Sequence, residues 1–462
     1  MAWRGGQTAT LEIARVDRGA TRLRSHRRVG RGWGRSLLAL ALGVLYPFHS
    51  YVAGVNVSAG DGVVALVGLI LVFQFAARTV PLPRYTVHAF LLGLIIISSL
   101  AINSVVPSGF FALLPGAVEA LKYVAAVAWM IALYWLLRDQ LPRRLLVFAC
   151  TSVLMATGFA ILTVYQNLFL HAQRPTGPFE NPNIYGNYLV LNVFLAMCAA
   201  NLLAEDRGGG ETRSSLLLRS GRTVGLLVVI PVLTVGVLAT GSRGTLVGFL
   251  AGLVVVLRLR PPTALGPRKL LAGVLAIVTL AVAVAWFLEH HPYVLARLGR
   301  TGSTDPNVEH RLALWRAAFD AFAAHPLFGI GYGQFTSYAG YMRLWRAQVA
   351  HQTYLSMGAE LGLLGLLVFL WLLWAVMRDS WRVQVAKGGG SRLGRICCGF
   401  AVATSVQGLF NNVEQFRSLW ITFGIVAALV AYARTARARA AVVSSGGDPA
   451  GYVQPARTRQ QL

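Results

Sequence analysis

The 462-residue chain has little charge, because only 13% of its residues are Asp, Glu, Lys or Arg. Soluble globular proteins carry roughly 25% charged residues. The shortage is concentrated in uncharged stretches such as 145–170 and 270–288, each long enough to cross a bilayer. The composition therefore excludes a soluble enzyme and a disordered chain, and it predicts an all-α polytopic membrane protein.

Cysteine is also scarce in this chain. The four cysteines, Cys150, Cys198, Cys397 and Cys398, lie inside apolar stretches and have no C-x-x-C spacing. Neither a disulfide scaffold nor a zinc site is indicated. The sequence also lacks an H-E-x-x-H motif and an aspartate cluster, so we predict no metal and no other cofactor.

The net charge of +25 does not by itself indicate a nucleic-acid-binding protein. The 42 basic residues are not clustered on one soluble domain, but flank the apolar spans, as membrane topology requires. We therefore predict the lipid bilayer, and no nucleic acid, as a partner.

Twelve apolar stretches are candidate transmembrane helices, of which the second, eighth and twelfth are short for a bilayer. They cover approximately residues 37–55, 63–77, 88–103, 117–137, 145–168, 185–204, 223–239, 244–257, 270–288, 353–377, 396–410 and 418–432.

The distribution of basic residues gives the direction of these spans. With the N-terminus inside, the cytoplasmic segments hold 32 Lys or Arg and the outer segments hold 9. This asymmetry follows the positive-inside rule. We therefore predict a cytoplasmic (inner) membrane protein with both termini in the cytoplasm. It would have a basic tail at 1–36, a membrane domain at 37–432 and a disordered tail at 433–462.

One outer segment, about 290–350, is too polar to span the membrane and too long for a simple turn. Within it, the stretch 309–323 places Leu312, Trp315, Phe319 and Phe322 on one helical face, and the stretch 334–348 is rich in aromatic residues. We predict two amphipathic helices at the outer interface, joined by a tight turn at 326–333.

The outer arginines are informative because topology does not require them. Arg243 lies on a very short connection between two spans, flanked by glycines that let a ligand approach. It is either an interfacial anchor or a ligand-binding group. Arg311 and Arg316 belong either to a solvated helical face or to a guanidinium site that grips a pyrophosphate.

His351 stands at the entry to the tenth span, with the polar residues Gln352 and Thr353 beside it. An imidazole with a pKa near neutrality can take a proton from a hydroxyl. The alternative is an interfacial histidine with a purely structural role.

Four stretches carry these residues in order along the chain. They are R-P-T-G-P-F-E-N-P-N at 174–183, T-G-S-R-G at 240–244, R-L-A-L-W at 311–315 with H-P-L-F-G-I-G at 325–331, and A-H-Q-T-Y-L at 350–355. Together they resemble the O-antigen ligase and polymerase family of membrane glycosyltransferases. The likeness covers about 170–370, and the twelve-span layout with a large outer loop extends it over most of the chain.

The resemblance implies an active site at the outer face of the membrane. In this family, outer arginines hold the pyrophosphate of a polyprenyl-linked glycan, and a histidine at the start of the helix after the large loop acts as base. Those roles fall on Arg243, Arg311 and His351. The family usually has Asn after that histidine, whereas this chain has Gln352, with the same donor atoms but a longer reach.

Further polar residues of the four stretches are expected to contact the substrate. They are Arg174, Asn181, Asn183, Ser242, His310, Arg316, Gln352 and Tyr354.

These features favour a transferase that moves a glycan from a polyprenyl-pyrophosphate donor to a hydroxyl of an envelope glycan or glycolipid acceptor. A single displacement with one base inverts the anomeric centre, and the arginines make a metal ion unnecessary. Within the family, a polymerase that joins lipid-linked repeat units is the alternative. From other classes, a twelve-helix transporter, whose halves would be expected to repeat, and a non-catalytic membrane scaffold are the competing interpretations.

Overall fold

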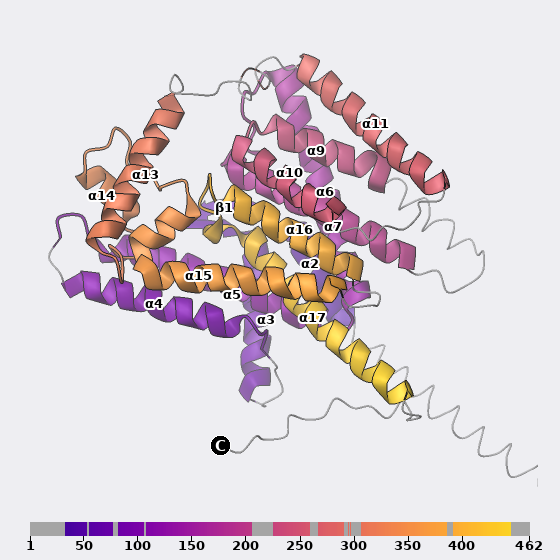
Figure 1. The fold of residues 1–462 in the computed structure, drawn as a ribbon, viewed down its shortest axis with the longest axis horizontal. Coiled ribbons are helices and arrows are strands. Elements are labelled where there is room, and N and C mark those ends of the chain that lie inside the picture. The colour runs from indigo at the N-terminus through magenta and orange to yellow at the C-terminus, as the bar shows by residue number, and fades with distance from the viewer. Residues whose placement is uncertain are drawn as a thin grey trace, which may run out of the picture.

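The computed structural model describes residues 33–52, 55–76, 82–105, 108–205, 225–258, 267–290, 294, 296, 306–385 and 391–444. These residues form an all-α polytopic membrane protein whose helices pack side by side (Figure 1). Six of the described helices are long and apolar enough to cross a membrane, and five more are apolar but shorter. Most of the tail predicted at 1–36 lies outside the described residues.

Each of the twelve predicted spans overlaps a helix, because uninterrupted apolar runs are a strong signal for a transmembrane helix. The helices are α2 (Trp33–Leu45), α3 (Ala59–Ala76), α4 (Thr86–Val105), α5 (Leu113–Leu137), α6 (Leu141–Leu170), α7 (Pro182–Glu205), η2 (Gly225–Val229) with α9 (Ile230–Ala239), α10 (Arg243–Arg258), α11 (Pro267–His290), α15 (Thr353–Val385), α16 (Ser391–Gln407) and α17 (Arg417–Ser444).

The prediction for the first span, 37–55, is wrong in its second half. The helix α2 ends at Leu45, and an antiparallel hairpin follows, formed by β1 (His49–Val52) and β2 (Val55–Ser58). The sequence of β2 alternates apolar and polar residues, V-N-V-S, which is the pattern of a strand and not of a membrane helix.

The C-terminal prediction also changes. The tail predicted to be disordered from residue 433 is helical as far as Ser444, and only 445–462 lies outside the described residues. The stretch 433–441 contains only Ala, Arg and one Thr, and both Ala and Arg are strong helix formers, so α17 continues beyond its apolar part.

Helix α10 lies close along α16, and three glycines at four-residue spacing make this possible. A Cβ atom on Gly248 would lie 2.4 Å from the Ala403 carbonyl oxygen, and one on Gly252 would lie 2.5 Å from the Gly399 carbonyl oxygen. Small residues at this spacing let two membrane helices approach at backbone distance. The packing fixes the first turn of α10, which begins with Arg243.

The turn predicted at 326–333 packs against a kink in α15. Gly362 breaks the helix with a φ of 68°, where a Cβ atom would lie 2.3 Å from the Leu327 carbonyl oxygen. The turn also donates backbone hydrogen bonds to α15, from Ile330 to Ala359 over 2.9 Å and from Gly331 to Glu360 over 3.2 Å. Since only glycine adopts such a φ without strain, these contacts explain the glycine-rich sequence.

The outer segment forms two helices, as expected, but the second is shorter than predicted. Helix α13 (Pro306–Ala324) covers the predicted stretch 309–323, whereas α14 (Phe335–Tyr341) stops seven residues short of 348. The small face of α13, with Leu314 and Ala318, is buried against the protein. Leu312 and Phe319 are exposed, so these two apolar side chains point away from this core.

Candidate active site

His351 occupies the sharp turn between the outer segment and α15. Its φ of 52° lies in the left-handed region, which costs a residue with a β-carbon about 1–2 kcal/mol. The turn is held by Gln352, whose side-chain oxygen accepts a hydrogen bond from the Leu355 backbone N–H. Gln352 thus caps the start of α15, directly after His351.

The surroundings of His351 favour its neutral form. Burial, the Arg311 guanidinium and the neighbouring His310 together lower the pKa of His351 to about 4. The imidazole is therefore uncharged at neutral pH, with one ring nitrogen able to accept a proton. This is the protonation state that a general base requires.

Arg311 comes from α13, which packs against α15. Its Nη1 atom donates a hydrogen bond of 3.3 Å to the Phe410 carbonyl oxygen, in the segment that follows α16. Arg316 lies five residues further along, about 140° around the helix, and is exposed. The helix therefore directs Arg311 and Arg316 to different faces.

His310, the third predicted residue on α13, contacts the aromatic part of the outer segment. Its ring meets the Trp345 ring edge to face, with the two centroids 5.8 Å apart. His310 also contributes to the lowered pKa of His351.

The start of α10, which carries Arg243, lies against the same segment after α16. Arg243 is the first residue of α10, and the next residue, Gly244, is so close to that segment that a Cβ atom would lie 2.7 Å from Phe410 Cβ. Phe410 therefore lies between the α10 terminus and Arg311. Two arginines that are 68 residues apart in the sequence are brought to one loop.

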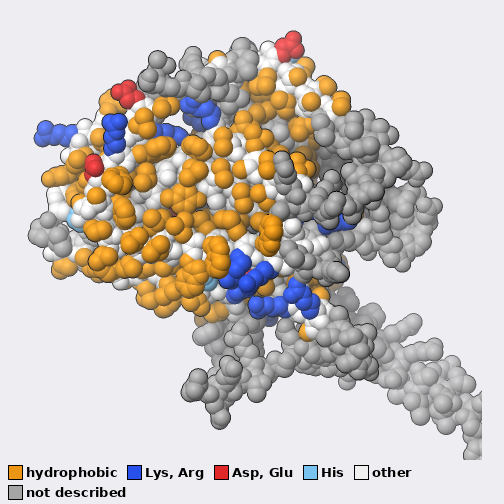
Figure 2. Space-filling view, viewed as in Figure 1, with side chains coloured by type: hydrophobic (Ala, Val, Ile, Leu, Met, Phe, Trp, Pro, Cys, Tyr) orange, Lys and Arg blue, Asp and Glu red, His pale blue; other side chains and the backbone are white. Residues whose placement is uncertain are grey.

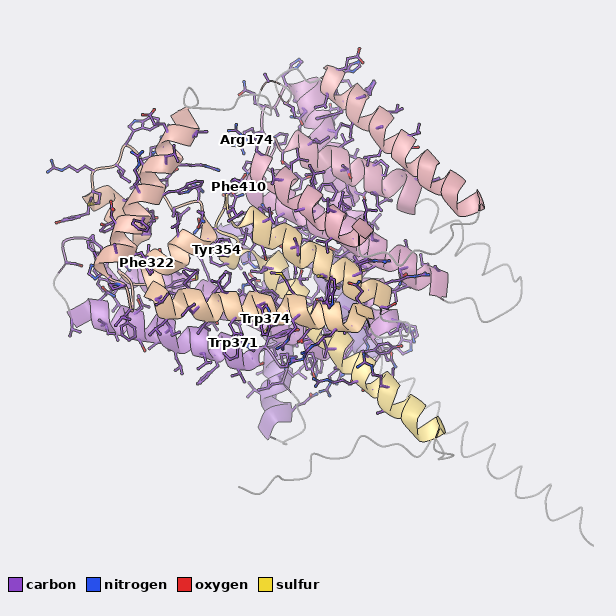
Figure 3. The ribbon with its side chains drawn as sticks, viewed as in Figure 1. Arg174, Phe322, Tyr354, Trp371, Trp374 and Phe410 are labelled. Atoms are coloured by element: carbon purple, nitrogen blue, oxygen red, sulfur yellow. The ribbon has the colours of Figure 1, made fainter. Side chains whose placement is uncertain are left out.

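Figure 3 labels Arg174, Phe410 and Tyr354, and in this view Phe410 lies between the other two. Arg174 is half-buried in the loop before η1 (Gly177–Phe179). In Figure 2, basic side chains gather in the same region, at the upper rim of the apolar surface. The Tyr354 hydroxyl is held in α15, where it donates a hydrogen bond of 2.7 Å to the Ser405 carbonyl oxygen.

The polar residues of the first two stretches are bound mainly to one another. Asn181 Oδ1 accepts from the Asn183 backbone N–H over 2.8 Å, at the start of α7. Ser242 Oγ donates to Asn183 Oδ1 over 2.7 Å and lies 2.8 Å from Thr245 Oγ1. Because Ser242 is buried, these contacts fix the two loops relative to each other.

Gln407, at the end of α16, extends this network and was not predicted from the sequence. Its Nε2 atom donates to Thr245 Oγ1 over 2.8 Å and to the Asn183 carbonyl oxygen over 3.2 Å, while its Oε1 atom accepts from Asn187 Nδ2 over 2.6 Å. One buried amide therefore joins α7, α10 and α16.

Residues 408–413, here called the 408–413 loop, were also missed. Thr353 binds this loop three times: its N–H donates to the Gly408 carbonyl oxygen over 2.8 Å, its Oγ1 donates to the Asn411 carbonyl oxygen over 2.7 Å, and Oγ1 accepts from the Val413 N–H over 2.8 Å. The loop thus holds the α15 terminus, Arg311 and the α10 terminus together. The polar residues Asn411 and Asn412, directly after an apolar span, were the available signal.

In the part of the chain that the structure describes, no three His, Cys, Asp or Glu residues gather as a metal site would require. The positive group beside His351 is Arg311 on α13, and Arg243 begins α10, whose first turn lies against the same 408–413 loop. This arrangement is suited to binding an anion next to a neutral imidazole.

Comparison with known families shows which family the region around His351 resembles. Residues 226–370 match the family model for O-antigen ligase, and they include Arg243, Arg311 and His351. No protein with a curated description matches the chain. The family match confirms the resemblance and identifies a multi-pass membrane glycosyltransferase of the ligase or polymerase type. Residues 226–370 of the chain therefore carry an O-antigen ligase domain.

Proposed function

We propose that the protein transfers a glycan from a polyprenyl-pyrophosphate donor to an acceptor hydroxyl at the outer face of the cytoplasmic membrane. The observation that carries this proposal is the neutral, half-buried imidazole of His351 beside Arg311. The orientation rests on the predicted topology, in which both termini are cytoplasmic and the outer segment faces away from the cytoplasm.

The reaction is a single displacement. His351 takes the proton of the acceptor hydroxyl, whose oxygen attacks the anomeric carbon of the donor sugar. The bond between that carbon and the phosphate oxygen breaks, and the electron pair leaves with the polyprenyl pyrophosphate. Attack from the face opposite the leaving group inverts the anomeric centre.

Arg243 and Arg311 bind the pyrophosphate and stabilise the negative charge that develops on it. A well-placed donor in such a site contributes about 3–4 kcal/mol to the transition state. The guanidinium groups supply the positive charge that a divalent cation provides in other phosphate sites, so we propose that transfer needs no metal. Treatment with a chelator is expected to leave the rate unchanged.

Donor binding is also expected to raise the pKa of His351. In the free protein the positive neighbours lower the pKa of His351. An anionic donor placed between them offsets part of this effect and makes the imidazole more basic. His351 therefore becomes a better proton acceptor when the leaving group is in position.

The variant His351→Asn gives a sharp test. Asn tolerates the left-handed backbone conformation of this position better than Ala does, and it cannot act as a base. With purified, reconstituted protein and a polyprenyl-pyrophosphate glycan, we expect transfer to fall by about 100- to 10,000-fold. Donor binding should persist. His325→Asn, at an exposed histidine on the same side, is the matched control and should transfer normally.

Near wild-type turnover by a folded His351→Asn variant would refute the assignment of the base. The same assay separates ligase from polymerase activity. Transfer to a distinct glycolipid acceptor supports a ligase, whereas extension of a second lipid-linked repeat unit supports the polymerase alternative.

A further inference from the structure

The end of α15 remote from His351 carries a second group of basic and aromatic side chains, where it packs against the start of α4. We call this group the α4–α15 cluster, and it consists of Arg84, His88, Trp371, Trp374, Arg378 and Asp379. The proposed transfer reaction uses none of these residues.

The cluster has an excess of positive charge. Asp379 is buried, with a side chain only 1% exposed, and its carboxylate lies 2.9 Å from Arg84 Nη1 and 3.4 Å from Arg378 Nη2. Its Oδ2 atom also accepts a hydrogen bond of 2.9 Å from the neutral Tyr85 hydroxyl. Two guanidinium groups therefore share one carboxylate, which leaves a net charge of about +1.

Two donors of the cluster have no hydrogen-bond partner among the described residues. They are Arg378 Nε and whichever ring nitrogen of His88 carries the proton, and all of these atoms are buried. Buried polar groups in proteins almost always have a partner. These donors therefore add to the positive potential of the cluster, with no acceptor among the described residues to offset it.

Aromatic rings place these donors at a membrane interface. The His88 ring lies against Trp371, with centroids 4.1 Å apart, and the Arg378 guanidinium lies 4.5 Å from the centre of the Trp374 ring. The two Trp side chains are 45% and 54% exposed. Exposed Trp next to Arg is the usual composition of the boundary between acyl chains and headgroups.

The surface of the protein also indicates that the α4–α15 cluster lies at the edge of an apolar face. Figure 2 shows Lys and Arg side chains gathered along the lower edge of a broad apolar face, with a histidine beside them. Figure 3 labels Trp371 and Trp374 in the same area, on and beside α15. A ligand at this edge would contact both the positive charges and the apolar surface above them.

We propose that the α4–α15 cluster binds an anionic phospholipid in the leaflet opposite the His351 site. The headgroup phosphate accepts hydrogen bonds from the exposed parts of the Arg84 and Arg378 side chains, which are 34% and 27% exposed, and the acyl chains lie on the apolar face beside Trp371 and Trp374. A lipid fits better than a free anion, because a free anion would leave the adjoining apolar surface uncovered. In the predicted topology this is the cytoplasmic leaflet.

The test uses purified full-length protein and native mass spectrometry with added dioleoylphosphatidylglycerol or dioleoylphosphatidylcholine. Arg378→Gln removes one positive group but keeps the pair between Asp379 and Arg84. We expect it to bind phosphatidylglycerol about fivefold more weakly than wild type, because the variant loses one of the basic side chains that contact the headgroup. Phosphatidylcholine binding should not change.

Arg392→Gln is the matched control, because Arg392 is an exposed arginine at the start of α16, on the same side of the membrane. It should bind phosphatidylglycerol as wild type does. Trp374→Leu keeps every charge and should also weaken phosphatidylglycerol binding, which protects the test if Arg378→Gln fails to fold. Equal phosphatidylglycerol binding by wild type and these cluster variants would overturn the proposal, as would displacement of the lipid by inorganic phosphate alone.

Discussion

The two ends of α15 are held in different ways. At its start, Thr353 and Ser356 are fixed by neutral hydrogen bonds, to the 408–413 loop and to Asn412. At its other end, Asp379 is fixed by two arginines. The contrast matters because His351 lies at the first end, and the groups that shift its pKa there are positive or neutral.

A carboxylate used as an anchor beside His351 would stabilise the imidazolium and raise its pKa. Backbone carbonyls and hydroxyls position the turn without this effect. The start of α15 can therefore be rigid while His351 stays neutral, whereas the far end uses ion pairs where no base is needed. Neutral hydrogen bonds therefore position the start of α15, and ion pairs are used at its far end.

The largest effect within this comparison is expected from Arg311. Arg311→Ala removes a guanidinium from the proposed pyrophosphate site and should lower transfer by about 100- to 1,000-fold. Arg311→Lys keeps the charge but loses the forked geometry, so its transfer should lie between that of the alanine variant and that of wild type. Transfer is measured with the reconstituted protein, and Arg346→Ala, at an exposed outer arginine, is the control. Full activity in Arg311→Ala would remove Arg311 from the anion site.

A smaller effect is expected from the neutral anchor. Thr353→Val keeps the shape of the side chain but removes the hydroxyl that joins Asn411 and Val413, leaving a buried backbone N–H without its partner. We expect a loss of about 1–3 kcal/mol in stability and a fall of roughly tenfold in turnover. Thermal unfolding and transfer rates report the two effects. Thr353→Ser should restore both, and its failure to do so would show that the hydroxyl is not the anchor.

The ion-paired end should affect stability and not the titration of His351. Asp379→Asn leaves two arginines without their shared carboxylate and should lower the melting temperature, because breaking a buried pair costs about 3–5 kcal/mol. The pH dependence of transfer should stay that of wild type, since no contact joins Asp379 to His351. A shifted pH profile in this variant would show that the two ends are electrostatically coupled.

The sequence predicted the helices well because their signal is local: an apolar run such as 145–168 is sufficient to identify α6. It failed for the hairpin at 49–58, because this short alternating pattern adjoins a membrane helix and was predicted to be part of that helix. It also could not find the 408–413 loop, which acts through backbone groups. The bonds of this loop to Thr353 and Arg311 join residues 55 to 99 positions apart. The local signal, the polar residues Asn411 and Asn412 after an apolar span, does not specify these partners.

Among the predicted site residues, His351, Arg311 and Arg243 are placed around the 408–413 loop because helix ends converge there. Asn181, Asn183 and Ser242 were selected for their polarity, and the fold uses that polarity to join two loops. Sequence alone cannot separate these uses, since a buried hydrogen-bond network and a sugar-binding site require the same side chains.

The most direct measurement is the pH dependence of kcat/KM for glycan transfer. Both phosphates of the donor are esterified and keep one charge each, so the acid side of the profile reports groups on the free protein. Because the pKa of His351 is lowered to about 4, the neutral base persists as the pH falls through 6 and is lost only near 4. The account therefore predicts nearly constant kcat/KM from pH 8 to about pH 5, with the decline centred near pH 4. A decline centred between about 6 and 7, the range of an unperturbed imidazole, would contradict it.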